Sequence, residues 1–414
     1  MKQDITPEGR AQRVTWETLE EHVRFKVQGF IQDLLEQEVT ELLGRGRSER
    51  RAVVDAAPGY RNGHGKPRRL TLGSGTVRVR RPRVRDVEER FESRVLPLFV
   101  RRTEQVSDLI PELYLHGLAE GDFDLALRGL LGEDAPLSAS TVARLKQKWQ
   151  AEMAGWNARR LDDLDVVYLW VDGVYVKAGL EDRKAAVLVL LGGLSDGRKV
   201  LVALKSGQRE STASWAGVLR DLRSRGLRAP RLVIGDGHLG IWAGLRQVYP
   251  EAQEQRCWNH RILNLLDRIG KKDQPAAIAL LRTIVYADTL QEAQRHKTSF
   301  QHWCRQRGYE EAGELIEEDW ERMVAFYGFP KEHWTHLRTT NPIESPFAAL
   351  RLRTDAAKRF KKVENATAVM WKMLLIAESR FRRLNAPELM QQLFQGAVYI
   401  NGIREEDNPE RLAA

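Results

Sequence analysis

The chain has 414 residues, 42% of them hydrophobic, which is enough for several domains with buried cores and excludes a disordered tail. Its net charge of +9 indicates a phosphate-rich partner, with solubility as the plain alternative. Two cysteines exclude a disulfide framework and indicate a reducing compartment. The start has no secretory signal, and no apolar run reaches the roughly 18 residues of a membrane span, so we expect a cytoplasmic protein.

The amino-acid composition changes once within the first hundred residues. Apolar residues recur at three- and four-residue intervals over residues 16–43, which predicts one or two amphipathic helices. Residues 44–102 instead carry glycines, prolines and alternating arginines. Within them RRLTLGSGTVRVRRPRV predicts two short strands around the Gly-Ser-Gly at 73–75.

The predicted hairpin is basic. Arg78 and Arg80 share one face of its second strand, and Arg81, Arg83 and Arg85 continue past it. Like charges this close repel one another unless an anion neutralises them. We therefore predict that Arg78, Arg80 and Arg83 contact DNA.

Helical patterns return over residues 107–118, 123–131 and 139–154, the last with a serine cap at Ser138 or Ser140. Two short helices and a longer one carrying Arg144, Lys146 and Lys148 are similar to a helix-turn-helix. The alternative is a three-helix bundle with a solvated basic face. The neighbouring hairpin favours DNA binding.

From residue 165 three β-rich runs follow one another, with the tight turn LSDGRK between the second and third. A capped helix, a buried strand, a second helix and a short strand leading into a helix come next. This order predicts an α/β fold with a mixed sheet. Residues 271–333 are helical in pattern and indicate an insertion, and a long helix is predicted over 363–384.

Three acids stand out, although each has a structural alternative. Asp172 lies in YLWVDGVYVK, where Asp-Gly is also a hairpin-turn signal. Asp236 follows a central-strand pattern, at the edge where α/β sheets bind ligands, but it also suits a turn or helix cap. Glu344 in TTNPIES also suits a helix start, with Asn341 as cap.

Taken together, the three acids indicate a metal site. Each follows a strand or begins a helix, and the chain between them can form one sheet. Three adjacent carboxylates raise one another's pKa unless a divalent cation neutralises them. Two Mg²⁺ ions held by carboxylates serve phosphoryl transfer, which is our hypothesis for Asp172, Asp236 and Glu344.

The chain resembles the mutator-type transposases of bacterial insertion sequences over roughly residues 24–384. The resemblance is carried by GYRNG and the basic hairpin, the aspartate on the first of three strands, GDGH, CWNH about twenty residues later, the helical insertion and TTNPIES. It implies a ribonuclease H-like core, a DDE triad at Asp172, Asp236 and Glu344, and two Mg²⁺ ions for which Mn²⁺ is expected to substitute. It also implies cleavage of element ends by water, followed by joining of the freed 3′-hydroxyl to target DNA.

The spacing of Cys257 and His260 also occurs in zinc sites, but no second pair with suitable spacing accompanies it, and Cys304 with His302 is a poor substitute. The family has a Cys-x-x-His signature here, so we expect His260 to act near the scissile phosphate and Cys257 to pack beneath the site. The plain alternative is a cysteine and a histidine at a strand end. His238 is a further candidate for phosphate contact, and Trp320 is either a core residue or a base-stacking platform.

A basic run follows Glu344, where DNA must lie if the triad is real. Its predicted DNA contacts are Arg351, Arg353, Lys358 and Arg359. The predicted domains are a helical module (1–60), a basic hairpin segment (61–103), a helix-turn-helix-like region (104–160), the core's first part (161–272), a helical insertion (273–338) and the core's second part (339–405).

We expect double-stranded DNA as partner, both element ends and target, and a homodimer or higher assembly on it. The alternatives are a metal-dependent nuclease on the same fold, which cuts without joining, and a DNA-binding regulator with an inactive core. The three acids argue against the inactive core.

Overall fold

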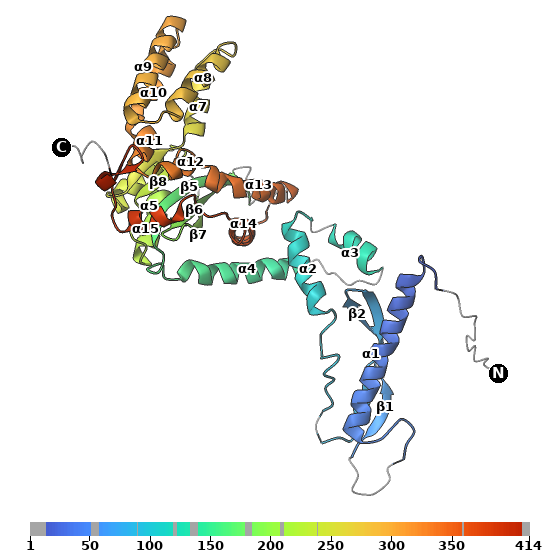
Figure 1. Ribbon diagram of the computed structural model, residues 1–414. Coiled ribbons are helices and arrows are strands. Elements are labelled where there is room, and N and C mark those ends of the chain that lie inside the picture. Colours follow the sequence, from blue (N-terminus) through green and yellow to red (C-terminus); the bar gives the residue numbers. More distant parts are fainter. Residues whose placement is uncertain are drawn as a thin grey trace. The chain divides into compact units, whose positions relative to one another are not determined.

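The computed structural model describes residues 14–50, 58–88, 90–118, 122–132, 140–178, 184–207, 211–237, 239–357 and 360–407. The chain forms two compact units, Met1–Leu145 and Lys146–Ala414 (Figure 1). Within the described ranges, no helix combines the length and apolar character needed to cross a bilayer.

The first unit begins with one long helix and four short strands. These are α1 (Leu19–Leu43), β1 (Tyr60–His64), β2 (Arg68–Leu72), β3 (Gly75–Val79) and β4 (Pro82–Arg85). The predicted hairpin is confirmed as the antiparallel pair β2 and β3. The antiparallel pairing of β1 with β4 was not predicted.

Helix α1 packs on the hairpin. Leu35 of α1 and Val77 and Val79 of β3 are buried in one apolar cluster. Gln28 and Gln32, one helical turn apart, hydrogen-bond to the backbone of β3 at Arg78 and Arg80. Because side chains alternate along a strand, burial of the valines leaves both arginine side chains exposed.

Three helices follow: α2 (Glu104–Leu115), α3 (Phe123–Leu131) and α4 (Ser140–Ala158), which continues into the second unit. They match the predicted helices to within a few residues. Ser140 is the first residue of α4, and Ser138 lies outside the described residues. The helix-turn-helix assignment stays a prediction.

The second unit contains a five-stranded sheet in the order β7-β6-β5-β8-β9. Its strands are β5 (Val166–Lys177), β6 (Lys184–Leu194), β7 (Lys199–Gly207), β8 (Leu232–Gly235) and β9 (Gln253–Arg256). The pairs β5–β6 and β6–β7 are antiparallel, and β5–β8 and β8–β9 are parallel. The prediction of an α/β fold with a mixed sheet is confirmed.

The central strand β5 is buried on both faces. On one face Leu169 and Val171 join a core with Trp215 of α5 (Thr212–Ser224) and Trp242 of α6 (Leu239–Val248). The side chain of Ser211 caps α5 by accepting a hydrogen bond from the N–H of Ser214. Asp172 and Gly173 lie inside β5, both paired with β6, so the hairpin-turn alternative for this Asp-Gly was wrong.

The helical prediction for residues 271–333 is confirmed, and in Figure 1 α8, α9 and α10 extend away from the sheet. The helices after β9 are α7 (Trp258–Leu266), α8 (Gln274–Val285), α9 (Leu290–Arg307), α10 (Glu310–Glu318), α11 (Trp320–Val324) and α12 (Trp334–Leu337). The chain then forms α13 (Asn341–Ala356), α14 (Val363–Glu378), α15 (Pro387–Phe394), β10 (Tyr399–Ile400) and β11 (Ile403–Arg404). Short 3₁₀ turns occur at Ala325–Gly328, Lys331–His333 and Glu405–Asp407.

Candidate functional site

Strand register brings Asp172 and Asp236 together. The parallel pairing of β5 with β8 sets Trp170 opposite Ile234, an offset of 64 residues. Asp236 follows β8 directly, just beyond the last residues that β5 and β8 pair. After burial, the charge of Asp236 is the next cause that raises the pKa of Asp172, so the two carboxylates lie near each other.

One face of β5 carries the contacts that lead to Glu344. The Tyr168 hydroxyl is 2.8 Å from Nδ1 of His333, and the indole N–H of Trp170 donates to the carbonyl of His336 at 3.0 Å. Asp172 is the next residue on this face, and α13, which follows the segment containing both histidines, packs on β5. Glu344 lies in the first turn of α13.

The start of α7 joins these segments. The N–H of Cys257 donates to the carbonyl of Gly235, the last residue of β8, at 2.8 Å. The N–H of Trp258 donates to the carbonyl of Arg338 at 2.9 Å, and the amide of Asn259 bonds to Asn341 at 3.0 Å. The first turns of α7 and α13 are therefore fixed beside the carboxyl end of β8.

Thr340 holds Glu344 in place. It is fully buried and is the N-cap residue of α13, with Pro342 in the first turn. Its hydroxyl hydrogen-bonds to Oε1 of Glu344 and lies 3.2 Å from the sulfur of Cys257, to which its backbone N–H donates at 3.3 Å. A helix does begin here, as the structural alternative for Glu344 proposed, but Thr340 and not Asn341 occupies the N-cap position, and its side chain makes no capping hydrogen bond.

The electrostatics of Asp172 reflect its neighbours. Burial is the main cause that raises the pKa of its carboxyl to about 7, and the charges of Asp236 and Glu344 raise it further. A hydrogen bond from the N–H of Gly173, at 2.7 Å, acts in the opposite direction. Three predicted site residues therefore interact in the folded chain, although 172 positions separate the first from the last.

His260 lies beside Glu344 in the same site. Its Nδ1 is 3.9 Å from Oε1 of Glu344, and both side chains are about one-third exposed, at 37% and 32%. Hydrogen bonding with Cys257 is the largest of the causes that raise the pKa of His260 to about 9, and the charges of Glu344 and Asp236 contribute. Cys257 is buried beneath it.

The donor set suits a hard divalent cation. Mg²⁺ prefers oxygen ligands, and a cation would relieve the mutual repulsion that raises the pKa of Asp172. The three carboxylates are less tightly grouped than a second set. Within the described part of the chain, the one group of three potential ligand atoms that all lie within 4.8 Å of one another is Cys257, His260 and Glu344.

Gly237 and Arg256 are site features that the sequence analysis missed. Gly237 follows Asp236 with a φ of +99°, where side chains are strained, and a Cβ there would lie 2.2 Å from Nε of Arg256. Arg256 in turn forms an ion pair with Asp319, which also binds Arg322 at 2.7 Å. The motif GDGH contained the signal, since a glycine directly after a strand-end acid often marks a left-handed turn.

Other predicted site residues of this unit are placed as follows. Trp320 is 7% exposed and packs edge-on against Trp258, with ring centroids 6.5 Å apart, so it is a core residue. Arg351 is exposed on α13, whereas Arg353 is only 2% exposed and presents no surface to a DNA backbone. His238, Lys358 and Arg359 lie outside the described residues.

In the first unit and on α4, most of the predicted cations are exposed. Arg78 is exposed on β3, Arg80 is exposed directly after it, and Arg144 is exposed on α4. Lys146 is half-buried, and Lys148 is 71% exposed and lies 3.8 Å from Glu152, one turn along the same helix. These residues remain predicted DNA contacts.

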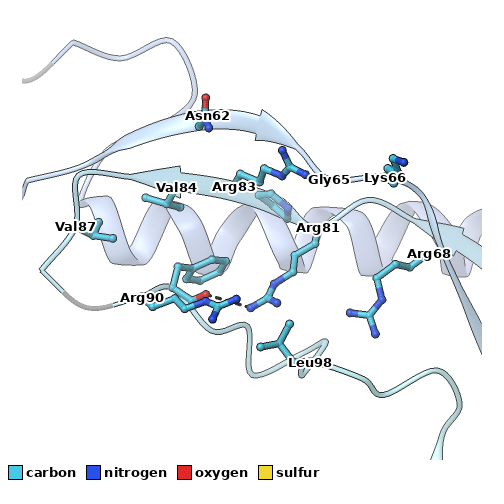
Figure 2. Close-up of a pocket in the computed structure, with 12 residues that line it drawn as sticks. Asn62, Gly65, Lys66, Arg68, Arg81, Arg83, Val84, Val87, Arg90 and Leu98 are labelled. Carbon is cyan, nitrogen blue, oxygen red and sulfur yellow. Dashed lines mark hydrogen bonds between the residues drawn. The ribbon is translucent and has the colours of Figure 1, made fainter.

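The first unit also contains a basic pocket of about 630 Å³ between the β1–β4 pair and the segment that follows it. We call it the basic pocket. Its cationic lining residues are Lys66, Arg68, Arg81, Arg83 and Arg90, and none of the described residues that line it is acidic. Figure 2 shows Arg68 and Arg81 reaching to the same side, toward the segment with Arg90 and Leu98.

The cations of the basic pocket are held close together. Arg81 donates to the carbonyl of Phe91 at 3.1 Å and lies over its ring at 5.8 Å, and Arg68 donates to the carbonyl of Val100 at 2.7 Å. Burial, followed by the charges of Arg81 and Arg101, lowers the pKa of Arg68. Carbonyl oxygens satisfy the guanidinium N–H groups without neutralising the charge, so the pocket favours an anion.

Comparisons with known proteins agree with the motifs. The sequence model of the family described as "Transposase, Mutator family" matches residues 5–382. The transposase for insertion sequence element IS6120 of Mycolicibacterium smegmatis is 44% identical over 297 residues, which is 72% of this chain and 92% of that protein. The transposase for element IST2 of Acidithiobacillus ferrooxidans is 41% identical over 280 residues, 67% of this chain and 94% of the relative. The transposase for element ISRM5 of Rhizobium meliloti is 28% identical over 348 residues, 83% of this chain and 84% of that relative.

Proposed function

The chain belongs to the Mutator family of transposases, and we propose that it cuts the ends of an insertion sequence and joins them to target DNA by metal-dependent phosphoryl transfer. The observation that carries the proposal is the meeting of three distant acids. Asp172 lies in β5 and Asp236 directly follows the neighbouring strand β8, and the charges of Asp236 and Glu344 both act on Asp172.

We propose that the second unit is a ribonuclease H-like core. The order of its sheet supports this assignment, because three antiparallel strands in chain order are followed by two parallel strands on the other side of β5. The helices α8 to α11 would then be an insertion into this core, since they separate β9 and α7 from α13, which carries Glu344.

Asp172, Asp236 and Glu344 would hold two Mg²⁺ ions, for which Mn²⁺ would substitute. Bound there, such ions neutralise charge on the phosphate and activate the attacking oxygen, water in the first step and a 3′-hydroxyl in the second. The contribution of the protein is to position the three carboxylates. The pairing of β5 with β8 brings the segments of the two aspartates together, and Thr340 fixes the carboxylate of Glu344 by a hydrogen bond.

His260 would assist at the scissile phosphate. Its ring is partly exposed and next to Glu344, and the raised pKa keeps it protonated at neutral pH. A protonated imidazole donates hydrogen bonds from both nitrogens, which suits contact with a phosphate oxygen. The buried Cys257 hydrogen-bonds with it.

The basic pocket of the first unit would hold DNA backbone. Its five cations match a run of phosphates, which bind through charge independently of sequence. Of the arginines that the sequence singled out, Arg83 lines this pocket, whereas Arg78 lies exposed on β3 and Arg80 lies exposed directly after it. Two element ends must be held together for transposition, so a dimer or higher assembly on DNA is expected.

The proposal is tested with purified protein, a labelled DNA fragment that carries an element end, a plasmid target, and either Mg²⁺ or EDTA. Asp236→Ala is compared with Asp196→Ala, an acid in the β6–β7 turn whose side chain is 45% exposed and paired with Arg198. We expect metal-dependent cleavage and joining by the wild type and by Asp196→Ala, and neither by Asp236→Ala.

Other outcomes assign other functions. Cleavage without joining identifies a nuclease on the same fold. DNA that is bound but never cut, with every metal tested, identifies a DNA-binding regulator and means that the acids are structural.

A further inference from the structure

A second set of ligand atoms lies beside the three acids. The sulfur of Cys257, a ring nitrogen of His260 and a carboxylate oxygen of Glu344 all lie within 4.8 Å of one another. This set differs from the acids in chemistry, because it combines one soft ligand, one imidazole and one carboxylate. It shares only Glu344 with them.

Local structure brings the three side chains together. Cys257 is the N-cap residue of α7, and His260 lies three positions later, so both point to one side of the first turn. Glu344 enters from the first turn of α13, which the hydrogen bonds from Trp258 to Arg338 and from Asn259 to Asn341 hold beside α7. The sequence supplied only the first two ligands, and the fold adds the third.

The ligand atoms are close to coordination geometry. With zinc bonds of about 2.0 to 2.3 Å, tetrahedral ligand atoms are separated by about 3.3 to 3.8 Å. Nδ1 of His260 and Oε1 of Glu344 are already 3.9 Å apart. Apart from the neighbouring Cys257 sulfur, the buried Nδ1 has no hydrogen-bond partner among the described residues.

Ligand softness selects the metal. Thiolate and imidazole favour Zn²⁺, whereas Mg²⁺ takes oxygen ligands and leaves a thiol unbound. Three protein ligands leave the fourth zinc position for water, and the partial exposure of His260 and Glu344 gives access to it. Binding would release the thiol proton of Cys257 and the imidazolium proton of His260 to solvent, and no redox change is required.

We propose that Cys257, His260 and Glu344 form a Zn²⁺ site whose occupation withdraws Glu344 from Asp172 and Asp236 and thereby stops DNA cleavage. The inhibition rests on the role proposed above for Glu344, but the binding of Zn²⁺ does not. The transposase then has one carboxylate that serves either of two metals.

Binding is tested without DNA by titrating the metal-free protein with Co²⁺, a spectroscopic substitute for Zn²⁺. A Cys257 ligand gives a thiolate-to-cobalt charge-transfer band, and added Zn²⁺ abolishes the band by displacing Co²⁺. Absence of the band in the wild type overturns the site.

Matched variants assign the ligands. Cys257→Ser removes the sulfur, and Cys304→Ser is its control, because Cys304 is the only other cysteine of the chain and is buried in α9. We expect the band to vanish in Cys257→Ser and to persist in Cys304→Ser, and a band that persists in Cys257→Ser overturns the proposal.

Glu344→Gln, at a partly exposed position, is the second variant, and we expect it to weaken Zn²⁺ binding at least about tenfold. Thermal unfolding confirms that each variant is folded.

Inhibition is tested by adding Zn²⁺ to the cleavage reaction at fixed Mg²⁺. The wild type should lose at least nine-tenths of its rate once Zn²⁺ saturates the Co²⁺-defined site, and a zinc chelator should restore that rate. An unchanged rate with the site saturated overturns the inhibitory role. If the wild type does not cleave even without Zn²⁺, the proposed function fails, while the Co²⁺ titration still decides the site.

Discussion

The basic pocket and the three acids differ in how far apart their residues lie in the sequence. The cations come from residues 66–90, so neighbours in sequence become neighbours in space. The acids lie at 172, 236 and 344, and they meet through strand register and through hydrogen bonds between helix starts. The first site sums many similar charges, while the second depends on the position of each group.

This difference predicts how each site responds to substitution. Electrostatic binding to phosphates is graded, because each cation contributes one small share. Phosphoryl transfer requires every group in place at once, so losing one contact at the acids costs far more than losing one cation of the pocket.

The largest effect is expected for Asp172→Asn. Cleavage should fall at least about 1,000-fold, since the charge that holds a catalytic metal is lost. DNA affinity should stay within about threefold, because the pocket is unchanged. The unfolding temperature should stay the same or rise, because the neutral amide removes the burial of a charge and its repulsion with Asp236 and Glu344, the causes that raise the pKa of Asp172. Cleavage assays, binding titrations and calorimetry measure the three quantities, and an equal fall in binding and cleavage would break the comparison.

Thr340→Val should have the next largest effect. It removes the hydroxyl that bonds to Glu344 and keeps the shape of the side chain. We expect the Mg²⁺ concentration for half-maximal cleavage to rise about 10- to 100-fold, as for other residues that orient a metal ligand. Thr340→Ser should restore it, because serine retains the hydroxyl. A valine variant with normal Mg²⁺ dependence would show that the bond does not position Glu344.

Gly237→Ala tests the turn after Asp236. A Cβ at a φ of +99° and close to the Arg256 side chain should lower the free energy of unfolding by about 1–3 kcal/mol and should reduce cleavage by displacing Asp236. The control is Gly217→Ala, inside α5 with no atom within 4 Å of the added carbon, which should stabilise the protein by up to about 1 kcal/mol. Denaturant unfolding measures the change in the free energy of unfolding for both variants. Equal changes would show that Gly237 has no special role.

The smallest effect belongs to single cations. Arg81→Gln should weaken DNA binding a few-fold and lower the slope of log Kd against log salt concentration by about one, with cleavage per bound DNA unchanged. Arg80→Gln is the comparison, because Arg80 is exposed on the hairpin outside the pocket. A larger effect of Arg80→Gln on DNA binding would show that the hairpin face, and not the pocket, contacts DNA.

Much of the fold could be predicted because its signals are local. The β2–β3 hairpin, the caps and turns around α5, and the helices between residues 271 and 333 follow from periodicity and turn residues. The β1–β4 pair was missed because β1, YRNGH, has neither alternation nor β-branched residues. Asp-Gly at 172 and 173 resembled a turn because a turn and a buried strand can share a dipeptide, and only pairing with β6 decides between them.

The candidate site likewise divides into residues that the sequence predicted and contacts that it did not. The acids were found as residue types that follow a predicted strand or begin a helix, but their contacts were not, because Thr340, Gly237 and Arg256 act through tertiary contacts that leave no periodic pattern. Arg353 was predicted to contact DNA from its charge alone. Its burial depends on how α13 packs, which the sequence does not reveal.

The wide spacing of the acids also has a consequence in time. A ribosome completes Asp172 and Asp236 well before Glu344, which is 108 residues further along the chain. Until that last helix start emerges and docks beside α7, the nascent chain holds two aspartates without their partner. Under the proposed function, a truncated or half-made protein would keep the basic first unit for DNA binding and lack the means to cut DNA, so the order of synthesis would itself protect the genome.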